Sequence, residues 1–336
     1  MSVAARPVGL VSPLRILLSD AARVALGPRL TETLGTVAHV LLSPAQEPAD
    51  FDIAFVSRDV TGLSTKHAVL PATQHFYDLL TNAPSLAWVQ LHSAGADRPV
   101  YVKLLAQGVA LSSSAGSNAG VVAQSALAGV LALARRLPQL MAAQRAHVWA
   151  PLLKTGLPRD MGGQTAVIVG WGGIGQQLGS VLRLLGLRVV VVRSSATPAG
   201  EGIETVAYEA IDSVLPQADW LLLACPLSDR TQGLISASAL ALLPAGAHVI
   251  NVARGEVIDE PALIEALQNG RVAGAYLDVF AHEPLPVQSP LWDMPNVIAS
   301  PHSAGFSDAN VARVEEVFLD NLERRLQGQA MRNLVG

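Results

Sequence analysis

A glycine-rich turn between a strand and a helix constrains this chain more than any other stretch of its sequence. The segment "TAVIVGWGGIGQQLGSVLRLLG" spaces Gly170, Gly172 and Gly175 as Gly-x-Gly-x-x-Gly, directly after β-branched residues and before a helical pattern. The first glycine allows a tight turn, the second lets a pyrophosphate approach the backbone, and the third lets helix and strand pack closely. Free N–H groups at the helix start then face the phosphate. The pattern predicts a dinucleotide-binding unit; a purely structural turn is the alternative.

The rest of the chain alternates strand and helix patterns. In the second half a helix is expected after each of the first four strands and a loop after the fifth. The six strand candidates there are "TAVIVG", "RVVVVR", "ADWLLLAC", "AHVINVAR", "GAYLDVF" and "NVIASPH". In the first third, strands are expected at residues 15–19, 38–42, 52–57, 86–91 and 109–113. This alternation predicts an α/β protein with doubly wound parallel sheets.

Length and two helical patterns indicate how these sheets are divided. A chain of 336 residues is long enough for two domains, at roughly 100–200 residues each. Residues 121–150 are predicted to form one long, mostly buried helix, broken near Pro138, that joins two lobes. A second, amphipathic helix is expected near the C-terminus, with acidic residues early and basic ones late.

Composition excludes several classes of function. A net charge of −4 and dispersed basic residues give no general attraction to nucleic acid or anionic membranes. A single cysteine, Cys225, excludes an internal disulfide framework and a cysteine-based zinc site, so no metal is expected. No apolar segment approaches the roughly 20 residues of a membrane span. The N-terminal stretch is interpreted as a short flexible lead rather than a targeting segment. We therefore expect a cytoplasmic protein.

Three charged or titratable residues follow predicted strands of the second half. Arg254 follows "HVINVA", Glu283 comes shortly after "AYLDVF", and His302 follows "NVIAS". Each has an alternative interpretation: Arg254 could pair with Asp259, Glu283 could be a solvated carboxylate, and His302 could hydrogen-bond to a neighbour. Because open α/β sheets bind ligands at the carboxyl ends of their strands, we expect all three at one edge.

Together these residues suit the reduction of a small 2-keto acid. An arginine fork can hold the substrate carboxylate and polarise its carbonyl group. A histidine can give a proton to the carbonyl oxygen, while a nicotinamide cofactor supplies the hydride. A carboxylate on the other ring nitrogen fixes the tautomer and favours the imidazolium.

The chain resembles the D-isomer-specific 2-hydroxyacid dehydrogenases from about Leu86 to its C-terminus. The matching segments are "GQTAVIVGWGGIG", "LLACPLSDRTQGLI", "INVARGEVIDEPALIEAL", "GAYLDVFAHEPLP", "SPLWDMPNVIASPHSAG" and "FLDNLERRLQGQAMRNLV". The family's catalytic arginine, glutamate and histidine fall on Arg254, Glu283 and His302. The resemblance implies a Rossmann cofactor domain at 117–304, inserted into a flavodoxin-like substrate domain made of 1–116 and 305–336. It also implies a homodimer.

The resemblance assigns further site residues. "LHSAGAD" matches a loop whose backbone N–H groups hold the substrate carboxylate, which implies Ala94 and Gly95 as donors beside Arg254. His92, just before that loop, is interpreted as structural or pocket-lining. Thr231 is expected to bind phosphate or to stabilise its loop, and Asp278 to bind the nicotinamide carboxamide, with a loop cap as the alternative. The full set of expected cofactor-binding residues is Gly170, Gly172, Gly173, Ile174, Gly175, Arg193, Ser194, Ser195, Cys225, Pro226, Thr231, Val252, Ala253, Asp278, His302 and Ala304.

Two departures from the family pattern concern the cofactor. Gly173 stands where the family's turn often has an arginine near the pyrophosphate, and Gln124 replaces a frequent glutamate at the start of the linking helix. Neither change removes a catalytic group.

The end of the second strand bears on the choice of cofactor. An acidic residue usually binds the adenosine ribose there, but this chain has Arg193, Ser194 and Ser195. A guanidinium and two hydroxyls suit the 2′-phosphate of NADP, whereas a surface arginine extending from a buried strand is the alternative. The sequence therefore favours NADP(H) over NAD(H).

Two other functions remain open at this point. The fold also serves corepressor-type proteins that bind the dinucleotide without significant turnover. Formate or phosphite dehydrogenases are the alternative within enzymes, but the formate enzymes usually have glutamine where this chain has Glu283. Glyoxylate or hydroxypyruvate reduction is the favoured specific activity.

Overall fold

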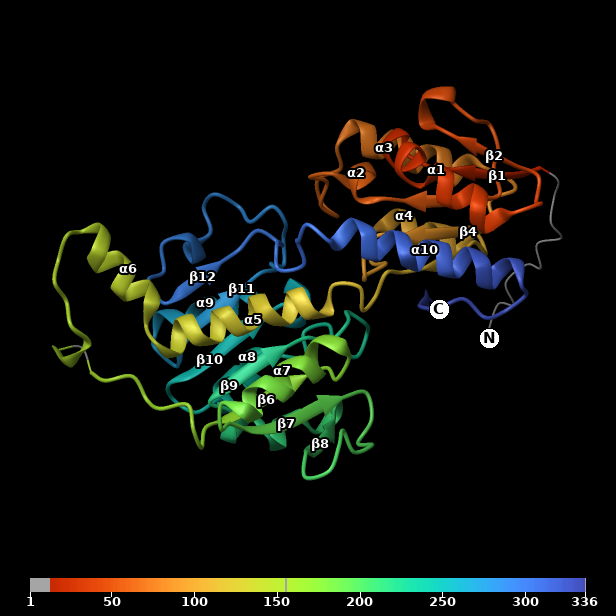
Figure 1. Cartoon of the computed structure of the whole chain (residues 1–336). Coiled ribbons are helices and arrows are strands. Elements are labelled where there is room, and N and C mark those ends of the chain that lie inside the picture. Colours follow the sequence, from red (N-terminus) through yellow and green to blue (C-terminus); the bar gives the residue numbers. More distant parts are fainter. Residues whose placement is uncertain (1–12, 155, 336) are drawn as a thin grey trace. The chain divides into compact units, whose positions relative to one another are not determined.

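The computed structural model describes residues 13–154 and 156–335, and it separates into two compact units (Figure 1). The first unit contains the chain up to Ser117 and again from Ser307 onwards. The second contains Asn118–Phe306. The flexible lead expected at the N-terminus covers residues 1–12, which lie outside the described residues.

The first unit is built on a six-stranded sheet with the order β13-β5-β4-β3-β1-β2. Its strands are β1 (Leu14–Leu17), β2 (His39–Leu42), β3 (Ile53–Val56), β4 (Trp88–Leu91), β5 (Ala110–Ser112) and β13 (Leu334–Val335). The five parallel strands were all predicted, and their order is that of flavodoxin-like sheets. The two-residue strand β13 was not predicted, and it pairs antiparallel with β5.

Helices cover both faces of this sheet. One face packs against α1 (Asp20–Leu34) and α10 (Asn310–Leu326), through residues such as Leu26 and Phe318. The other packs against α2 (Arg58–Thr61), α3 (Pro71–Asn82) and α4 (Pro99–Ala106). The expected amphipathic C-terminal helix is α10. The Phe318 ring of α10 stacks on the Phe55 ring of the sheet, with 4.7 Å between the ring centres.

The second unit contains a seven-stranded parallel sheet with the order β12-β11-β10-β9-β6-β7-β8. The strands are β6 (Thr165–Val169), β7 (Arg188–Arg193), β8 (Glu204–Ala207), β9 (Trp220–Leu223), β10 (Ala247–Asn251), β11 (Val272–Leu277) and β12 (Val297–Ala299). The chain runs from β6 to one edge and then returns to fill the other side. This is the doubly wound Rossmann order, with its switch point between β6 and β9.

Two helical layers enclose this sheet as well (Figure 1). One face packs against α5 (Ala119–Ala134) and α7 (Gly173–Leu184). The other packs against α8 (Ala237–Leu242) and α9 (Glu260–Gln268). Six short 3₁₀ helices complete the described elements: η1 (Pro44–Gln46), η2 (Leu152–Lys154), η3 (Tyr208–Ser213), η4 (Leu215–Gln217), η5 (Gly255–Val257) and η6 (Pro290–Trp292).

The connection between β7 and β9 differs from the sequence prediction. A helix was expected there, but the chain forms the edge strand β8 followed by η3 and η4. Pro198, Gly200 and Gly202 interrupt any helical pattern after β7. Strand β8 is only partly buried, as an edge strand is, so it lacks the apolar run that marked its six neighbours. The predicted six strands are therefore corrected to seven.

The long linking helix is broken, as predicted. The bend is 70°, and it lies between α5 and α6 (Leu137–Arg145). Arg136 adopts a left-handed backbone conformation, with φ of 53°, and Pro138 lies in the first turn of α6, where proline is tolerated. Within the described residues no single helix is long and apolar enough to cross a membrane. Only the bent pair α5 and α6, taken together, reaches the necessary length and apolar composition.

Candidate functional site

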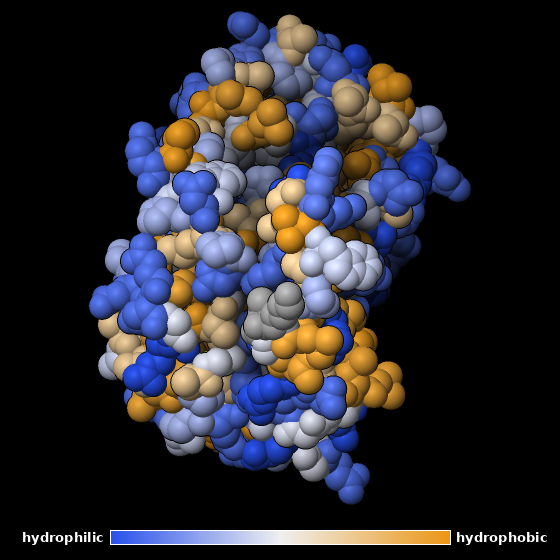
Figure 2. Space-filling view, turned by 90° about the vertical axis from the view of Figure 1, so that its left-hand side faces the viewer, coloured by the Kyte–Doolittle hydropathy of each residue, from blue (hydrophilic) through white to orange (hydrophobic). Residues whose placement is uncertain are grey.

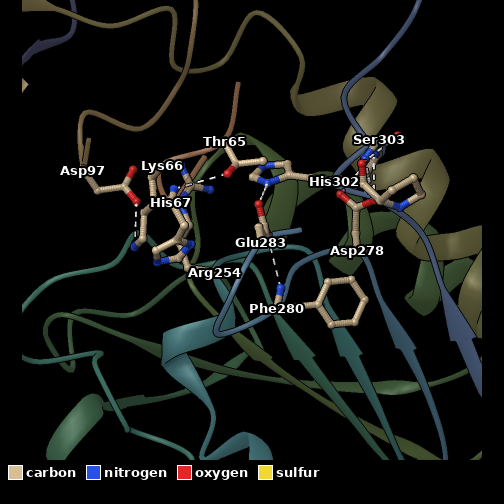
Figure 3. Close-up of polar contacts among 12 residues, drawn as sticks. Thr65, Lys66, His67, Asp97, Arg254, Asp278, Phe280, Glu283, His302 and Ser303 are labelled. Carbon is tan, nitrogen blue, oxygen red and sulfur yellow. Dashed lines mark hydrogen bonds and ion pairs between the residues drawn. The ribbon is translucent and has the colours of Figure 1, made fainter. Parts of the chain in front are cut away.

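The predicted acid, base and anion-binding residues lie at the carboxyl ends of three neighbouring strands. Arg254 follows β10, Glu283 lies in the loop after β11, and His302 follows β12. Strands β10, β11 and β12 are hydrogen-bonded in that order, so their loops leave the sheet at the same edge. Figure 3 shows the three side chains together.

His302 and Glu283 form a direct pair. His302 Nδ1 lies 2.8 Å from Glu283 Oε2, and the histidine side chain is half-exposed whereas the carboxylate is mostly buried. A carboxylate can only accept, so Nδ1 carries a proton and donates it. The other ring nitrogen, Nε2, makes no hydrogen bond to any residue that the structure describes. This arrangement leaves Nε2 to exchange a proton with a ligand.

Glu283 is held in its ionised form. Burial by itself raises the pKa of Glu283, but the hydrogen bond and positive charge of His302 act in the opposite direction. The Phe280 N–H, which donates to Glu283 Oε1 at 3.2 Å, and the charge of Arg254 also lower it. The net effect places the pKa of Glu283 below its usual value. An ionised Glu283 is therefore available to accept the hydrogen bond from His302 Nδ1.

Asp278 organises the loop that carries His302. Its buried carboxylate accepts hydrogen bonds from Ser303 N at 2.8 Å, from Ala304 N at 3.0 Å and from the Ser300 hydroxyl. Its carbonyl oxygen accepts from His302 N at 2.8 Å, and His302 has a left-handed φ of 50°. Burial raises the pKa of Asp278, against these hydrogen bonds. The sequence allowed two roles for Asp278, a contact to the nicotinamide carboxamide and a loop cap. The contacts within the unit provide the second of these roles.

The turn that carries Arg254 is fixed by two residues that the sequence analysis did not single out. The buried Asn251 side chain donates to Arg254 O and accepts from Ala253 N, both at 3.0 Å. Gly255 packs so closely on the next loop that a Cβ there would lie 1.8 Å from Phe280 C. Asp259, the suggested partner of Arg254, instead caps α9 by accepting from Ala262 N. An asparagine and a glycine flanking the turn were the signals that could have identified it.

The glycine turn fits a dinucleotide. Gly170 has φ of 99°, and a Cβ there would lie 2.6 Å from Ala224 O. A Cβ on Gly175 would lie 2.0 Å from Gly170 O, so the turn tolerates no side chain at either position. At Gly172 no described atom lies within 4 Å of the Cβ position. Helix α7 begins at Gly173 and Ile174, so its free N–H groups face this open space, where a pyrophosphate would bind.

The loop after β9 is closely packed. Cys225 is buried, which raises the pKa of its thiol to about 12 and makes it a packing residue rather than a nucleophile. The buried Thr231 hydroxyl donates to Pro226 O at 2.7 Å and accepts from Ser228 N at 2.8 Å. Of the two roles expected for Thr231, stabilisation of the loop is the one that these contacts provide. Val252, Ala253 and Ala304 are likewise buried.

The residues after β7 leave a positive charge uncompensated. Arg193 ends the strand, and its side chain makes no ion pair or hydrogen bond with the residues that the structure describes. Ser194 and Ser195 are exposed, and the Ser195 hydroxyl donates to Thr197 Oγ1 at 3.1 Å. A guanidinium without an acidic partner beside two hydroxyls has the composition of an anion site.

The other predicted substrate residues belong to the first unit. Ala94 and Gly95 lie in the loop after β4, where the Ser93 hydroxyl donates to Gly95 O at 2.7 Å. His92 Nε2 contacts Thr61 Oγ1 at 2.9 Å. Burial, assisted by the charges of Arg58 and Arg98, lowers the pKa of His92 to about 3. A neutral, hydrogen-bonded His92 matches its interpretation as a structural residue.

Comparison with known proteins identifies the family. The family described as "D-isomer specific 2-hydroxyacid dehydrogenase, NAD binding domain" matches residues 127–304. A glyoxylate/hydroxypyruvate reductase B of Pectobacterium carotovorum is 33% identical over 290 residues, which cover 84% of this chain and 89% of that protein.

Solved structures agree along nearly the whole chain. A D-isomer specific 2-hydroxyacid dehydrogenase from Xanthobacter autotrophicus Py2, in complex with NADPH and MES, has a TM-score of 0.75 at 28% identity, covering 97% of this chain and 98% of that one. A glyoxylate reductase from Paecilomyes thermophila has a TM-score of 0.78 at 25% identity, and the match covers 97% of this chain and 99% of that one. These relatives do not favour the corepressor or the formate and phosphite alternatives. The chain belongs to the D-isomer specific 2-hydroxyacid dehydrogenases, the oxidoreductases that interconvert 2-keto acids and D-2-hydroxy acids with a nicotinamide cofactor.

Proposed function

We propose that this protein is a glyoxylate/hydroxypyruvate-type reductase that uses NADPH to convert a small 2-keto acid into a D-2-hydroxy acid. The observation that carries the proposal is the His302–Glu283 pair, whose Nδ1 and Oε2 atoms lie 2.8 Å apart. Its two residues lie on the loops after β12 and β11, beside the loop of Arg254 after β10. The name of the Pectobacterium relative supports the choice of substrate class.

The proposed chemistry assigns one task to each side chain. When bound, the nicotinamide supplies the hydride. His302 gives the proton on Nε2 to the carbonyl oxygen, while its Nδ1–H stays on Glu283. The ionised Glu283 stabilises the imidazolium before transfer and fixes the ring orientation afterwards. Arg254 holds the substrate carboxylate in two parallel hydrogen bonds.

A screen of keto acids tests this function. The purified protein is incubated with NADPH and glyoxylate, hydroxypyruvate, pyruvate or 2-ketobutyrate, and oxidation of the cofactor is followed at 340 nm. We expect the highest kcat/KM with glyoxylate or hydroxypyruvate, and a D-configured product from the latter. Tight NADPH binding with no turnover of any keto acid would instead indicate a binding protein.

The proposed preference for NADPH depends on Arg193. Replacing Arg193 by Ala should lower kcat/KM for NADPH by about 10- to 100-fold, because a charge-assisted hydrogen bond to the 2′-phosphate contributes roughly 1.5–3 kcal/mol. The value for NADH should change less than about threefold, since NADH has no 2′-phosphate. Steady-state kinetics with each cofactor measure both values.

Arg188 supplies the matched control for this prediction. It begins the strand that Arg193 ends, and it pairs with Glu204 and Gln217 at the opposite end of β7. Arg188→Ala should leave the ratio of the two kcat/KM values unchanged. A wild-type protein that uses both cofactors equally would contradict the proposed preference.

We also propose that the protein is a homodimer that associates through the α6 region. Figure 2 views the side on which α6 lies and shows apolar side chains gathered there. The exposed apolar residues of this region are Leu137, Met141, Val148, Trp149, Leu153 and Leu157. Such a concentration on one helix and its following loop is typical of an interaction surface. The expected cytoplasmic location stays a prediction.

Light scattering tests the assembly. We expect a molar mass of twice the 35.1 kDa chain, and we expect Trp149→Glu to shift the population towards the monomer. Trp149 is 96% exposed, so a charge there should not disturb the folded unit itself. The exposed Val24, on α1 of the first unit, gives the control Val24→Glu, which should remain dimeric. A wild-type protein with the mass of one chain would contradict the proposal.

A further inference from the structure

A second arginine contacts the loop that follows β7. Arg230 lies in the loop after β9, and its Nη2 donates to Ser194 O at 2.9 Å. The peptide unit is planar and trans, so fixing the Ser194 carbonyl also fixes the direction of the following N–H, that of Ser195. Arg230 thus determines the backbone orientation of two residues in the proposed phosphate site.

Two residues of η3 hold the Arg230 guanidinium in place. Glu209 Oε1 accepts from Arg230 Nε at 2.9 Å and from Nη2 at 2.6 Å. The guanidinium carbon also lies 5.3 Å from the centre of the Tyr208 ring, within the range of a cation–π contact. Burial raises the pKa of Tyr208, and the positive charges of Arg230 and Arg193 partly oppose this effect.

The far end of the same loop is anchored separately. Trp171, the residue between the first two glycines of the turn, donates its ring N–H to Ala199 O at 3.1 Å. Ala199 N in turn donates to Thr205 Oγ1 of β8 at 3.0 Å. With Arg230 at Ser194 and these contacts at Ala199, the segment is tied at both ends. Its exposed hydroxyls are therefore presented by a fixed backbone rather than by a free loop.

We infer that Arg230 is a second specificity-determining residue for the 2′-phosphate of NADPH, with Glu209 as the carboxylate that moderates its charge. The inference rests on the proposed NADPH preference. Arg193 and Arg230 together place two cations beside Ser194 and Ser195, and a second guanidinium adds charge-assisted attraction for a phosphate dianion. Glu209 adds one negative charge to the same cluster, which lowers the attraction for the phosphate.

Two conservative variants test this role through effects of opposite sign. Arg230→Met keeps the length of the side chain but removes the charge and the bond to Ser194. Because the guanidinium is about half-exposed, we expect its loss to raise KM for NADPH by about 5- to 20-fold, with kcat and the NADH parameters nearly unchanged. Glu209→Gln keeps an acceptor for Arg230 and removes the negative charge. It should lower KM for NADPH by about two- to fivefold.

Binding of cofactor fragments gives a readout that is independent of catalysis. Calorimetric titration with adenosine 2′,5′-bisphosphate and with AMP compares adenosine sites with and without the 2′-phosphate. In Arg230→Met the Kd for the bisphosphate should rise while that for AMP stays constant. In Glu209→Gln the Kd for the bisphosphate should fall.

The outcomes separate this inference from the proposal on which it rests. If the wild type prefers the bisphosphate and Arg230→Met keeps that preference, the role of Arg230 is wrong and the NADPH proposal stands. Equal weakening of both fragments would make Arg230 a merely structural residue and would also overturn the inference. If the wild type binds both fragments equally, both the preference and the role of Arg230 fail.

Discussion

Replacing His302 by Ala is expected to lower kcat for keto-acid reduction by about 10²- to 10⁴-fold, the range that a positioned general acid contributes. The variant loses the proposed proton donor to the carbonyl oxygen, whereas the glycine turn and the loop after β7 are untouched. The Kd for NADPH, measured by quenching of protein fluorescence, should therefore stay within a small factor of the wild-type value. An unchanged kcat would refute the proposed mechanism.

Two further variants sharpen the test of the acid. His282 is exposed and lies beside Glu283, and its Nδ1 contacts Pro284 O at 3.3 Å. His282→Ala therefore controls for the loss of a nearby imidazole. This variant should retain most of the wild-type kcat. Glu283→Gln keeps a hydrogen-bond acceptor for His302 Nδ1 but replaces the carboxylate by a weaker, neutral one. We expect kcat to fall, while the Kd for NADPH stays close to the wild-type value. An unchanged kcat would argue against a role for the Glu283 charge.

The second large effect is expected for Arg254→Ala, which should raise KM for the keto acid and lower kcat together. Removing one partner of a close charge pair costs roughly 2–5 kcal/mol, so kcat/KM should fall by about 30- to several-thousand-fold. We expect both parameters to change because the same guanidinium is proposed to bind the carboxylate and to polarise the carbonyl group in the transition state. Steady-state kinetics over a wide range of keto-acid concentration measure the two parameters separately.

Arg254→Lys is the matched control for this variant. Lysine keeps the charge but cannot form two parallel hydrogen bonds, so it should recover part of the loss in KM and less of the loss in kcat. The Kd for NADPH should be unchanged in both variants. A change confined to cofactor affinity would show that Arg254 does not bind substrate.

The sequence predicted those parts of the molecule that depend on local pattern. The glycine turn, the buried strands and the residues just past their ends follow from spacing and from the geometry of parallel sheets, and so Arg254, Glu283 and His302 could be placed at one edge. Strand β8 could not be predicted in the same way, because an edge strand is only half buried and lacks a continuous apolar run.

The supporting contacts depend on segments that are distant in the sequence. Asn251 and Gly255 hold the Arg254 turn through contacts that only the folded chain reveals, and Arg230 reaches Ser194 across 36 positions. The rule that located Arg254, a charged residue beyond a strand end, applies equally to Arg230 after β9. It was missed because its partners, Ser194 and Glu209, come from two other strand connections.

The strand order of the second unit has a consequence for protein engineering. The residues of the hydride chemistry follow β10, β11 and β12, whereas the residues proposed to read the adenosine phosphate follow β7, β8 and β9, with the glycine turn after β6 between β7 and β9. The two groups share no loop. Cofactor use can therefore be redesigned by substitutions on one half of the sheet while the acid, the base and the anion anchor keep their surroundings. A change of cofactor from NADPH to NADH and a change of substrate can therefore be engineered by separate sets of substitutions in the same chain.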